Sequence, residues 1–170
     1  MKNPMLAIGL AVAMALSVSA LQAQSTDKDS QTFIRAAIQG NFAEIDNGKL
    51  AQRKAISPEV KAFGDMLVTD HTAANAKATQ VAKQLGVTPP NGSGMTPKAG
   101  YLKLKVLSGA AFDREFVRTM VKDNQKDIEE FQKAAHKSDP AGAFAMDFLP
   151  ALQKHLDMAQ KLTQQKESMR

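Results

Sequence analysis

The sequence predicts an all-α protein built as a four-helix bundle, and three observations support this prediction. From about residue 30 onward, apolar residues recur with the 3.6-residue period of a helix. Runs of β-branched residues are scarce, whereas Ala, Lys, Gln and Leu, which favour helices, are frequent. Turn-forming residues divide this part of the chain into four long segments joined by two short connections and one long one. That pattern is typical of a four-helix bundle.

The first two helices are separated by a short stop and restart. The first is expected from about residue 30 to 55. Ser57 then offers a side-chain oxygen to the free N–H groups of the next helix, and Pro58 takes the first helical position, where its missing N–H does no harm. The second helix should continue to about residue 85, because Gly86 is the residue type that commonly ends a helix.

One long connection, G-V-T-P-P-N-G-S-G-M-T-P at 86–97, follows the second helix. A short extra helix is expected after it, to about residue 107. The third long helix should span 110–136, and S-D-P at 138–140 starts a fourth that runs to about residue 165. The connection and its short helix would carry the chain along the bundle, as in ferritin-like folds. A simple up-down return is the alternative, and the sequence leaves both open.

The N-terminal residues 1–23 have the features of a secretory signal peptide in the expected order. Lys2 gives a short positive start, an apolar run occupies residues 5–18, and small residues follow in S-A-L-Q-A. Cleavage is expected after Ala23, with Ala20 as the second choice. An uncleaved membrane anchor is the alternative, although the run is shorter than the roughly 20 residues of a spanning helix.

This signal defines the expected domain organisation and compartment. Residues 24–170 should form a single bundle domain with its core in residues 30–163, since a chain of this length can bury one apolar core. We expect the protein to be exported to the periplasm, where it is either free or associated with the outer membrane.

The absence of cysteine and the modest charge exclude several classes of function. Without cysteine there are no disulfides, thiolate metal ligands or thiol nucleophiles. The formal net charge is +5, but the lysines are dispersed and Tyr101 is the only tyrosine. Nucleic-acid surfaces usually combine clustered basic residues with aromatic ones. We therefore expect no nucleic-acid partner.

Each long helix carries one polar residue near the middle of its apolar face. In chain order these residues are Glu44, His71, Asn124 and His155. The midpoints of helices of similar length share one layer of a bundle whichever way each helix runs, so the four side chains are expected to meet. A buried polar group without a partner costs roughly 2–7 kcal/mol. Four such groups in separate places would exceed what a domain stability of about 5–15 kcal/mol tolerates.

This polar layer is consistent with either a metal site or a hydrogen-bonded network. Bundles build metal sites from Glu and His on separate helices, so Glu44, His71 and His155 are candidate ligands for a single divalent ion such as Zn, Fe or Mn, with Asn124 as a fourth polar group. The alternative is a hydrogen-bonded network with trapped water. The residues alone favour the network over the metal.

Neither a di-iron centre nor a standard catalytic motif is expected. The ferritin-type site needs a Glu three residues before a His on two helices, and Val68 and Leu152 occupy those places. The chain also lacks a G-x-S-x-G motif and a phosphate-binding loop. These features favour a non-catalytic exported bundle, associated with the envelope or with stress, over an enzyme. A metal-binding or oxidative-stress protein is the alternative.

One further residue, Asp70, and one segment, residues 98–107, also have specific interpretations. Asp70 points about 100° away from His71 on a helix and is expected to be a charge at the rim of the layer rather than a partner of His71. The segment K-A-G-Y-L-K-L-K-V-L, residues 98–107, is either a lid packed over the end of the bundle or a basic and apolar contact with an anionic membrane surface. Its short length favours the lid.

Four stretches resemble a known family. They are N-F-A-E-I-D-N-G-K-L-A (41–51), V-K-A-F-G-D-M-L-V-T-D-H-T-A-A-N (60–75), G-A-A-F-D-R-E-F (109–116) and L-P-A-L-Q-K-H-L (149–156). Together they are similar to the bacterial secreted domain-of-unknown-function family 4142, which is regarded as ferritin-like and includes periplasmic and outer-membrane proteins. The resemblance implies that Glu44, His71 and His155 occupy the family's polar positions. The fourth position is usually His, whereas this chain has Asn124, a poor transition-metal ligand, and that departure speaks against a metal.

Overall fold

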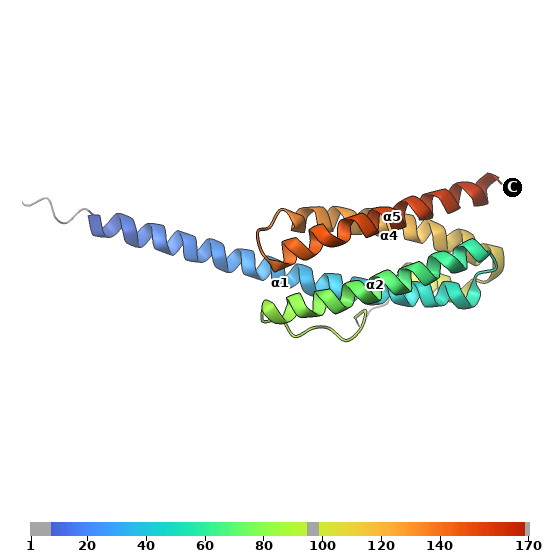
Figure 1. The fold of residues 1–170 in the computed structure, drawn as a ribbon, viewed down its shortest axis with the longest axis horizontal. Coiled ribbons are helices and arrows are strands. Elements are labelled where there is room, and N and C mark those ends of the chain that lie inside the picture. Colours follow the sequence, from blue (N-terminus) through green and yellow to red (C-terminus); the bar gives the residue numbers. More distant parts are fainter. Residues whose placement is uncertain (1–7, 95–98, 169–170) are drawn as a thin grey trace, which may run out of the picture.

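A computed structural model describes residues 8–94 and 99–168 of the chain, with side chains for residues 28–94 and 100–165. Its elements, in order, are α1 (Ile8–Lys54), α2 (Pro58–Gln84), α3 (Ala99–Val106), α4 (Gly109–Ala135) and α5 (Pro140–Ser168). Four long helices and the short α3 therefore pack as an all-helical bundle, which confirms the predicted fold class (Figure 1).

Helix α1 begins at Ile8 and not near Ser30, so the expected start was wrong. No Pro or Gly lies between residues 10 and 39 to break the helix, and its first part extends beyond the bundle (Figure 1). The predicted signal peptide is not tested: residues 1–7 lie outside the described part, and for residues 8–27 only the backbone is described. Among the described residues, no helix is both long and apolar enough to cross a membrane.

The long connection crosses from one end of the bundle to the other. Gln31 Nε2 donates to the carbonyl of Leu85, so the end of α2 lies beside the early bundle part of α1. At the opposite end, the backbone N–H groups of Ile56 and Ser57 donate to the Asp113 carboxylate near the start of α4. Helices α2 and α4 therefore run in the same direction, and the ferritin-like crossover holds in place of the up-down alternative.

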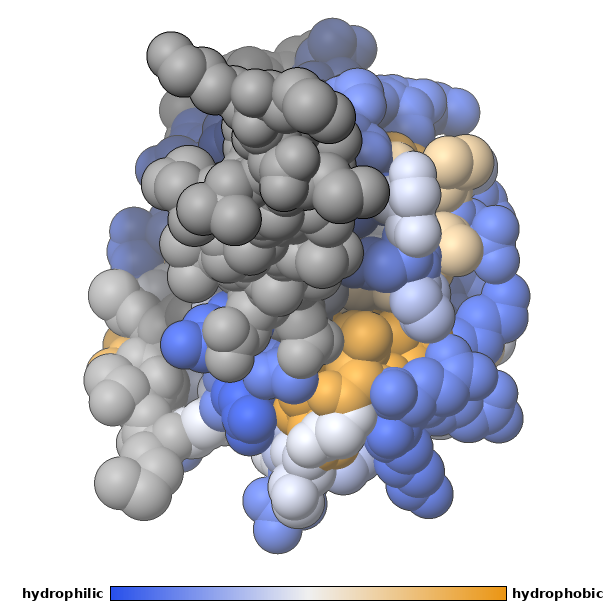
Figure 2. Space-filling view, turned by 90° about the vertical axis from the view of Figure 1, so that its left-hand side faces the viewer, coloured by the Kyte–Doolittle hydropathy of each residue, from blue (hydrophilic) through white to orange (hydrophobic). Residues whose placement is uncertain are grey.

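Two apolar clusters form the core, one in each half of the bundle. One contains Ile34, Ile38, Phe131, Phe144 and Phe148, and the other contains Leu50, Phe63, Phe112, Phe116 and Leu162. Every long helix contributes to both clusters. Figure 2 views the molecule from the end at which α1 enters, where hydrophilic residues surround a small hydrophobic area, as expected of amphipathic helices.

Helices α1 and α2 cross in near contact at two glycines. A Cβ added to Gly48 would lie 2.6 Å from the Gly64 carbonyl oxygen and 2.8 Å from Val68 Cγ2. A Cβ added to Gly64 would lie 2.8 Å from the Gly48 oxygen. The two glycines thus allow the backbones of α1 and α2 to approach closely. Gly40 differs, because an added Cβ there would meet nothing within 4 Å.

The start of α5 is held by a charged cap. Asp139 Oδ1 accepts from the Gly142 N–H at 2.8 Å, and Oδ2 accepts from the Ser30 hydroxyl at 2.5 Å. Burial alone would raise the pKa of Asp139, but the hydrogen bonds from Ser30 and from backbone N–H groups of α5, together with the Lys137 charge, outweigh it. The pKa therefore lies below the ordinary value of 3.8. The ionised carboxylate joins the α4–α5 turn to α1.

The glycine crossing gives a stability prediction. Replacement of Gly48 by alanine should lower the free energy of unfolding by about 1–3 kcal/mol, because the helices must move apart to admit the methyl group. Gly40→Ala, the matched control on the same helix, should be neutral or stabilising by up to about 1 kcal/mol, since alanine favours the helix. Urea unfolding followed by circular dichroism measures both. Equal effects of the two variants would contradict a close crossing at Gly48.

The Asp139 cap predicts a specific acid dependence. Its folded-state pKa is lowered, so its contribution to stability is complete above the unfolded value of 3.8 and is lost as pH falls through the folded pKa. Asp139→Asn should therefore be less stable than the parent at pH 7, and the difference in melting temperature should shrink below pH 4. Asp147→Asn, an exposed carboxylate on the same helix, is the control and should show no such pH-dependent gap.

Candidate functional site

A buried polar layer separates the two apolar clusters. All four residues predicted to form it are buried, with exposed fractions of 1 % for Glu44, 1 % for His71, 2 % for Asn124 and 0 % for His155. Each lies in its helix between the residues that belong to one cluster and those that belong to the other. The predicted burial of these four residues near the middle of their helices is therefore confirmed.

The two histidines meet in this layer. The imidazoles of His71, on α2, and His155, on α5, have ring centroids 5.2 Å apart at an interplanar angle of 42°. Phe148 packs edge-on against His71, and Phe63 packs in the same way against His155. The pair thus has an aromatic residue from each apolar cluster as a neighbour, which shields it from bulk water.

Each histidine is oriented by an oxygen from a neighbouring helix. His71 Nδ1 lies 2.9 Å from Asn41 Oδ1 on α1, and His155 Nε2 lies 2.9 Å from Asp70 Oδ2 on α2. Both oxygens are acceptors, so these nitrogens carry the protons in neutral imidazoles. The lone pairs are then on Nε2 of His71 and Nδ1 of His155.

The environment keeps His155 neutral at neutral pH. Burial lowers its pKa below the ordinary value of 6.5, and the hydrogen bond and charge of Asp70 offset this only in part. Its Nδ1 is buried and has no hydrogen-bond partner within the described residues. A buried acceptor of this kind suits a bound ion or an internal water.

Glu44 and Asn124 take different places in the layer. Glu44 lies three residues after Asn41, on the same face of α1 as the residue that binds His71. Asn124 Nδ2 donates to the Met120 carbonyl at 2.9 Å, so its amide group binds its own helix. Of the four predicted layer residues, the two histidines are in direct contact with each other.

Asn41 and Asp70 are the residues bonded to the two histidines that sequence reasoning did not identify. Asp70 lies at the rim of the layer, as expected, and its side chain is 30 % exposed. It nevertheless reaches His155 across the α2–α5 interface. The spacing of Asn41 to Glu44 was the available signal, because residues three apart share a helix face. No sequence pattern indicated the bond of Asp70, since its partner belongs to another helix.

Further buried amides extend the polar layer along α1 and α2. Asn41 Nδ2, Asn47 Oδ1 and both polar atoms of Asn75 are buried without a hydrogen-bond partner among the described residues. Each unpaired buried group costs about 1–3 kcal/mol. The layer therefore has unused hydrogen-bonding capacity for water or a small ligand. Within the described part of the chain, no group of three His, Asp or Glu side chains is placed to hold a metal ion.

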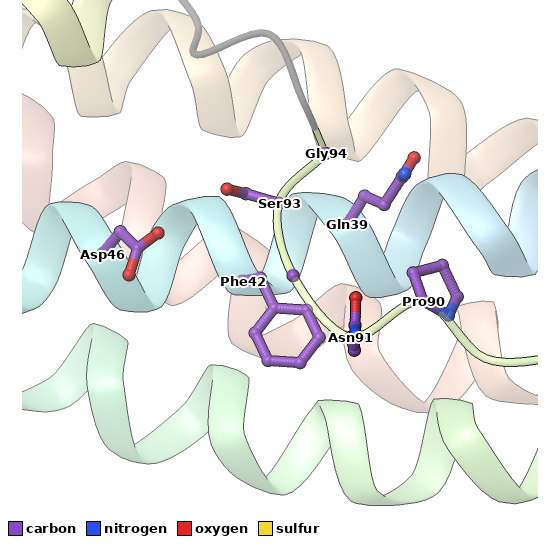
Figure 3. Close-up of a pocket in the computed structure, with 8 residues that line it drawn as sticks. Gln39, Phe42, Asp46, Pro90, Asn91, Ser93 and Gly94 are labelled. Atoms are coloured by element: carbon purple, nitrogen blue, oxygen red, sulfur yellow. The ribbon is translucent and has the colours of Figure 1, made fainter.

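A separate surface cavity of about 630 Å³ lies between α1 and the start of the crossover connection. Its lining consists of Gln39, Phe42, Asp46, Pro90, Asn91, Gly92, Ser93 and Gly94 (Figure 3). The predicted layer residues are not part of this lining. The mixture of amides, one carboxylate and one aromatic ring suits a small polar molecule rather than an apolar one.

Comparison with known proteins supports the fold and the family. No curated protein matches the sequence significantly. Among solved structures, the chain is similar to CopM in its Cu(II)-bound form, with 20% sequence identity and a TM-score of 0.66 over 80% of this chain and 96% of that chain. It is also similar to CopM in the Ag-bound form, with 20% identity, a TM-score of 0.64 and the same coverage. A family model described as domain of unknown function (DUF4142) matches residues 15–162, so the chain belongs to that family.

Proposed function

We propose that this chain is an exported, non-enzymatic metal-binding bundle of the cell envelope. It would hold one copper ion between His71 and His155. The observation that carries the proposal is the pair of adjacent imidazoles, each held by an oxygen from a neighbouring helix. The similarity of the fold to CopM, which is known in Cu(II)-bound and Ag-bound forms, adds support.

The hydrogen bonds around the two rings match the usual surroundings of metal-binding histidines. A ligating His commonly donates its other ring N–H to a carboxylate or carbonyl oxygen, which fixes the tautomer and the ring orientation. Asn41 and Asp70 act in this way here. Metal binding also requires the unprotonated imidazole, and the lowered pKa of His155 supplies it without a proton-release step near neutral pH.

The donor set favours copper over a structural zinc. A closed tetrahedral zinc site uses four protein ligands, whereas the structure brings together only two histidines in the described residues. Imidazole suits copper, and Cu(II) binds nitrogen sites more strongly than the other first-row divalent ions. Glu44 is buried in the same layer on α1, but it does not complete a three-residue metal-binding group with the two histidines in the described residues. When bound, the ion would serve as cargo or as a structural link between α2 and α5.

A second candidate function rests on the same hydrogen bonds. Both histidines already bind neighbouring side chains, so a purely structural layer that fixes the helix register explains their burial without a metal. In that case the protein is a non-catalytic envelope bundle. The two candidates make opposite predictions about bound metal, while both predict that the histidines matter for stability.

The three histidines of the chain provide a matched test. Purified protein should bind about one equivalent of Cu(II), measured by elemental analysis, and free ion at a hundredfold excess over Kd should stabilise the fold by about 2.7 kcal/mol. His71→Ala and His155→Ala should each abolish this stabilisation, because each removes one of the two nitrogen donors. His136→Ala removes an exposed histidine and should keep it.

Each remaining outcome decides between the candidates. If the parent protein neither retains copper nor shifts its melting temperature, and the His71 and His155 variants are only less stable, the layer is structural. If His136→Ala loses binding as much as the inner variants, copper binds at the surface and the proposed site is wrong. His71→Asn and His155→Asn serve as second variants if the alanine variants do not fold.

A further inference from the structure

Three of the exposed large apolar side chains gather at one end of the bundle. Among the described residues, the large hydrophobic side chains that are exposed are Ile56 (64 %), Leu102 (51 %), Val106 (82 %) and Met146 (61 %). Ile56 lies in the α1–α2 turn, and Leu102 and Val106 lie four residues apart on one face of α3. We call these three residues the apolar tip. Met146 lies in the first part of α5, towards the other end.

Hydrogen bonds hold the parts of the apolar tip side by side. Lys54 Nζ, at the end of α1, donates to the carbonyl oxygens of Lys105 at 2.5 Å and Leu107 at 2.9 Å. The C-terminal end of α3 therefore lies against the α1–α2 turn that carries Ile56. Helix α3 has a second face, on which Leu104 is fully buried in the core. The helix is thus the predicted lid over the bundle end, and its outer face is exposed among the described residues.

The charges around the apolar tip are mainly basic. Arg53, Lys61, Lys103 and Lys105 are exposed there, together with the acidic Glu59. Glu59 accepts a hydrogen bond from the Ser57 hydroxyl, and Lys103 pairs with Glu115 at 2.8 Å. Lys105 lies 6.0 Å from the Tyr101 ring centroid, which leaves its charge at the surface of α3. An apolar centre with a basic rim matches an anionic bilayer surface.

We propose that the apolar tip docks on an anionic lipid bilayer, with Ile56, Leu102 and Val106 at the acyl boundary and Arg53 and Lys105 at the headgroups. Charge complementarity selects this occupant: a second copy docked tip to tip would bring two basic rims together, whereas lipid phosphates attract them. The binding is peripheral, since α3 is only eight residues long. The proposal is independent of the metal site, because the tip contains neither His71 nor His155.

A site-specific fluorescent label tests the docking in the full chain. The protein has no cysteine, so Val106→Cys accepts a polarity-sensitive fluorophore at one position only. Vesicles of phosphatidylcholine with phosphatidylglycerol should shift its emission to the blue, and phosphatidylcholine alone should not. Met146→Cys, equally free of competing thiols and exposed on α5, should show no shift with either vesicle.

Charge reversal tests the basic rim. One basic residue near an anionic surface contributes about fivefold in affinity, so Arg53→Glu with Lys105→Glu should weaken vesicle binding by roughly 25-fold or more. Lys77→Glu with Lys133→Glu changes the net charge equally at exposed positions away from the tip and should have a small effect. High salt should weaken the binding of the parent protein as well.

Three results would overturn the proposal. Vesicle sedimentation without a shift of the Val106 label would mean that another segment, such as the apolar run at 5–18, binds the lipid. Equal weakening by the two charge-reversal pairs would mean that only net charge matters. A blue shift of the label without vesicles that grows with protein concentration would mean that the apolar tip binds a second copy.

Discussion

The need to pair buried polar groups governs the interior of this bundle. Apolar clusters fill both halves, and the polar layer between them is stable only where its side chains find partners. His71 finds Asn41 across the α1–α2 interface, and His155 finds Asp70 across the α2–α5 interface. Both bonds involve α2, so this helix links the two helical hairpins. A shift of α2 by one turn would break both bonds at once, and the layer therefore fixes the register of the core.

The close contact of α1 and α2 at Gly48 and Gly64 allows the bond between Asn41 and His71 to form. Asn41 lies seven residues before Gly48 on α1, and His71 lies seven residues after Gly64 on α2. In antiparallel helices these two pairs share one register, about two turns apart. The near contact at the glycines draws the helices together, so the short amide side chain reaches the imidazole. A bulkier pair at the crossing would separate the two bonding partners as well as the backbones.

The sequence predicted the helices and the burial of their polar residues well, but it predicted the hydrogen-bond partners of those residues poorly. The caps at Ser57 and Asp139, each followed by a proline, predicted two helix starts, and the inward position of the polar residues followed from helical period. The start of α1 was missed because no residue breaks the helix upstream. The Asp70 bond to His155 was missed because helical spacing describes one helix, whereas the contact depends on how two helices pack. The bond from Asn124 Nδ2 to the Met120 carbonyl of its own helix was not predicted, because helical spacing places a residue on a face but does not say which group it binds.

The crossover connection explains how one chain separates an enclosed polar layer from an exposed apolar end. Because the connection runs from one end of the bundle to the other, α3 lies beside the α1–α2 turn, where Lys54 binds the carbonyl groups of Lys105 and Leu107. There Leu104 closes one apolar cluster, and this leaves Leu102 and Val106 on the outside. A simple up-down return would place α4 directly after α2 and would need no such helix. The exposed face of α3 is therefore a consequence of the crossover topology. The same topology places α2 between α1 and α5, so that α2 forms one histidine bond with each of these helices.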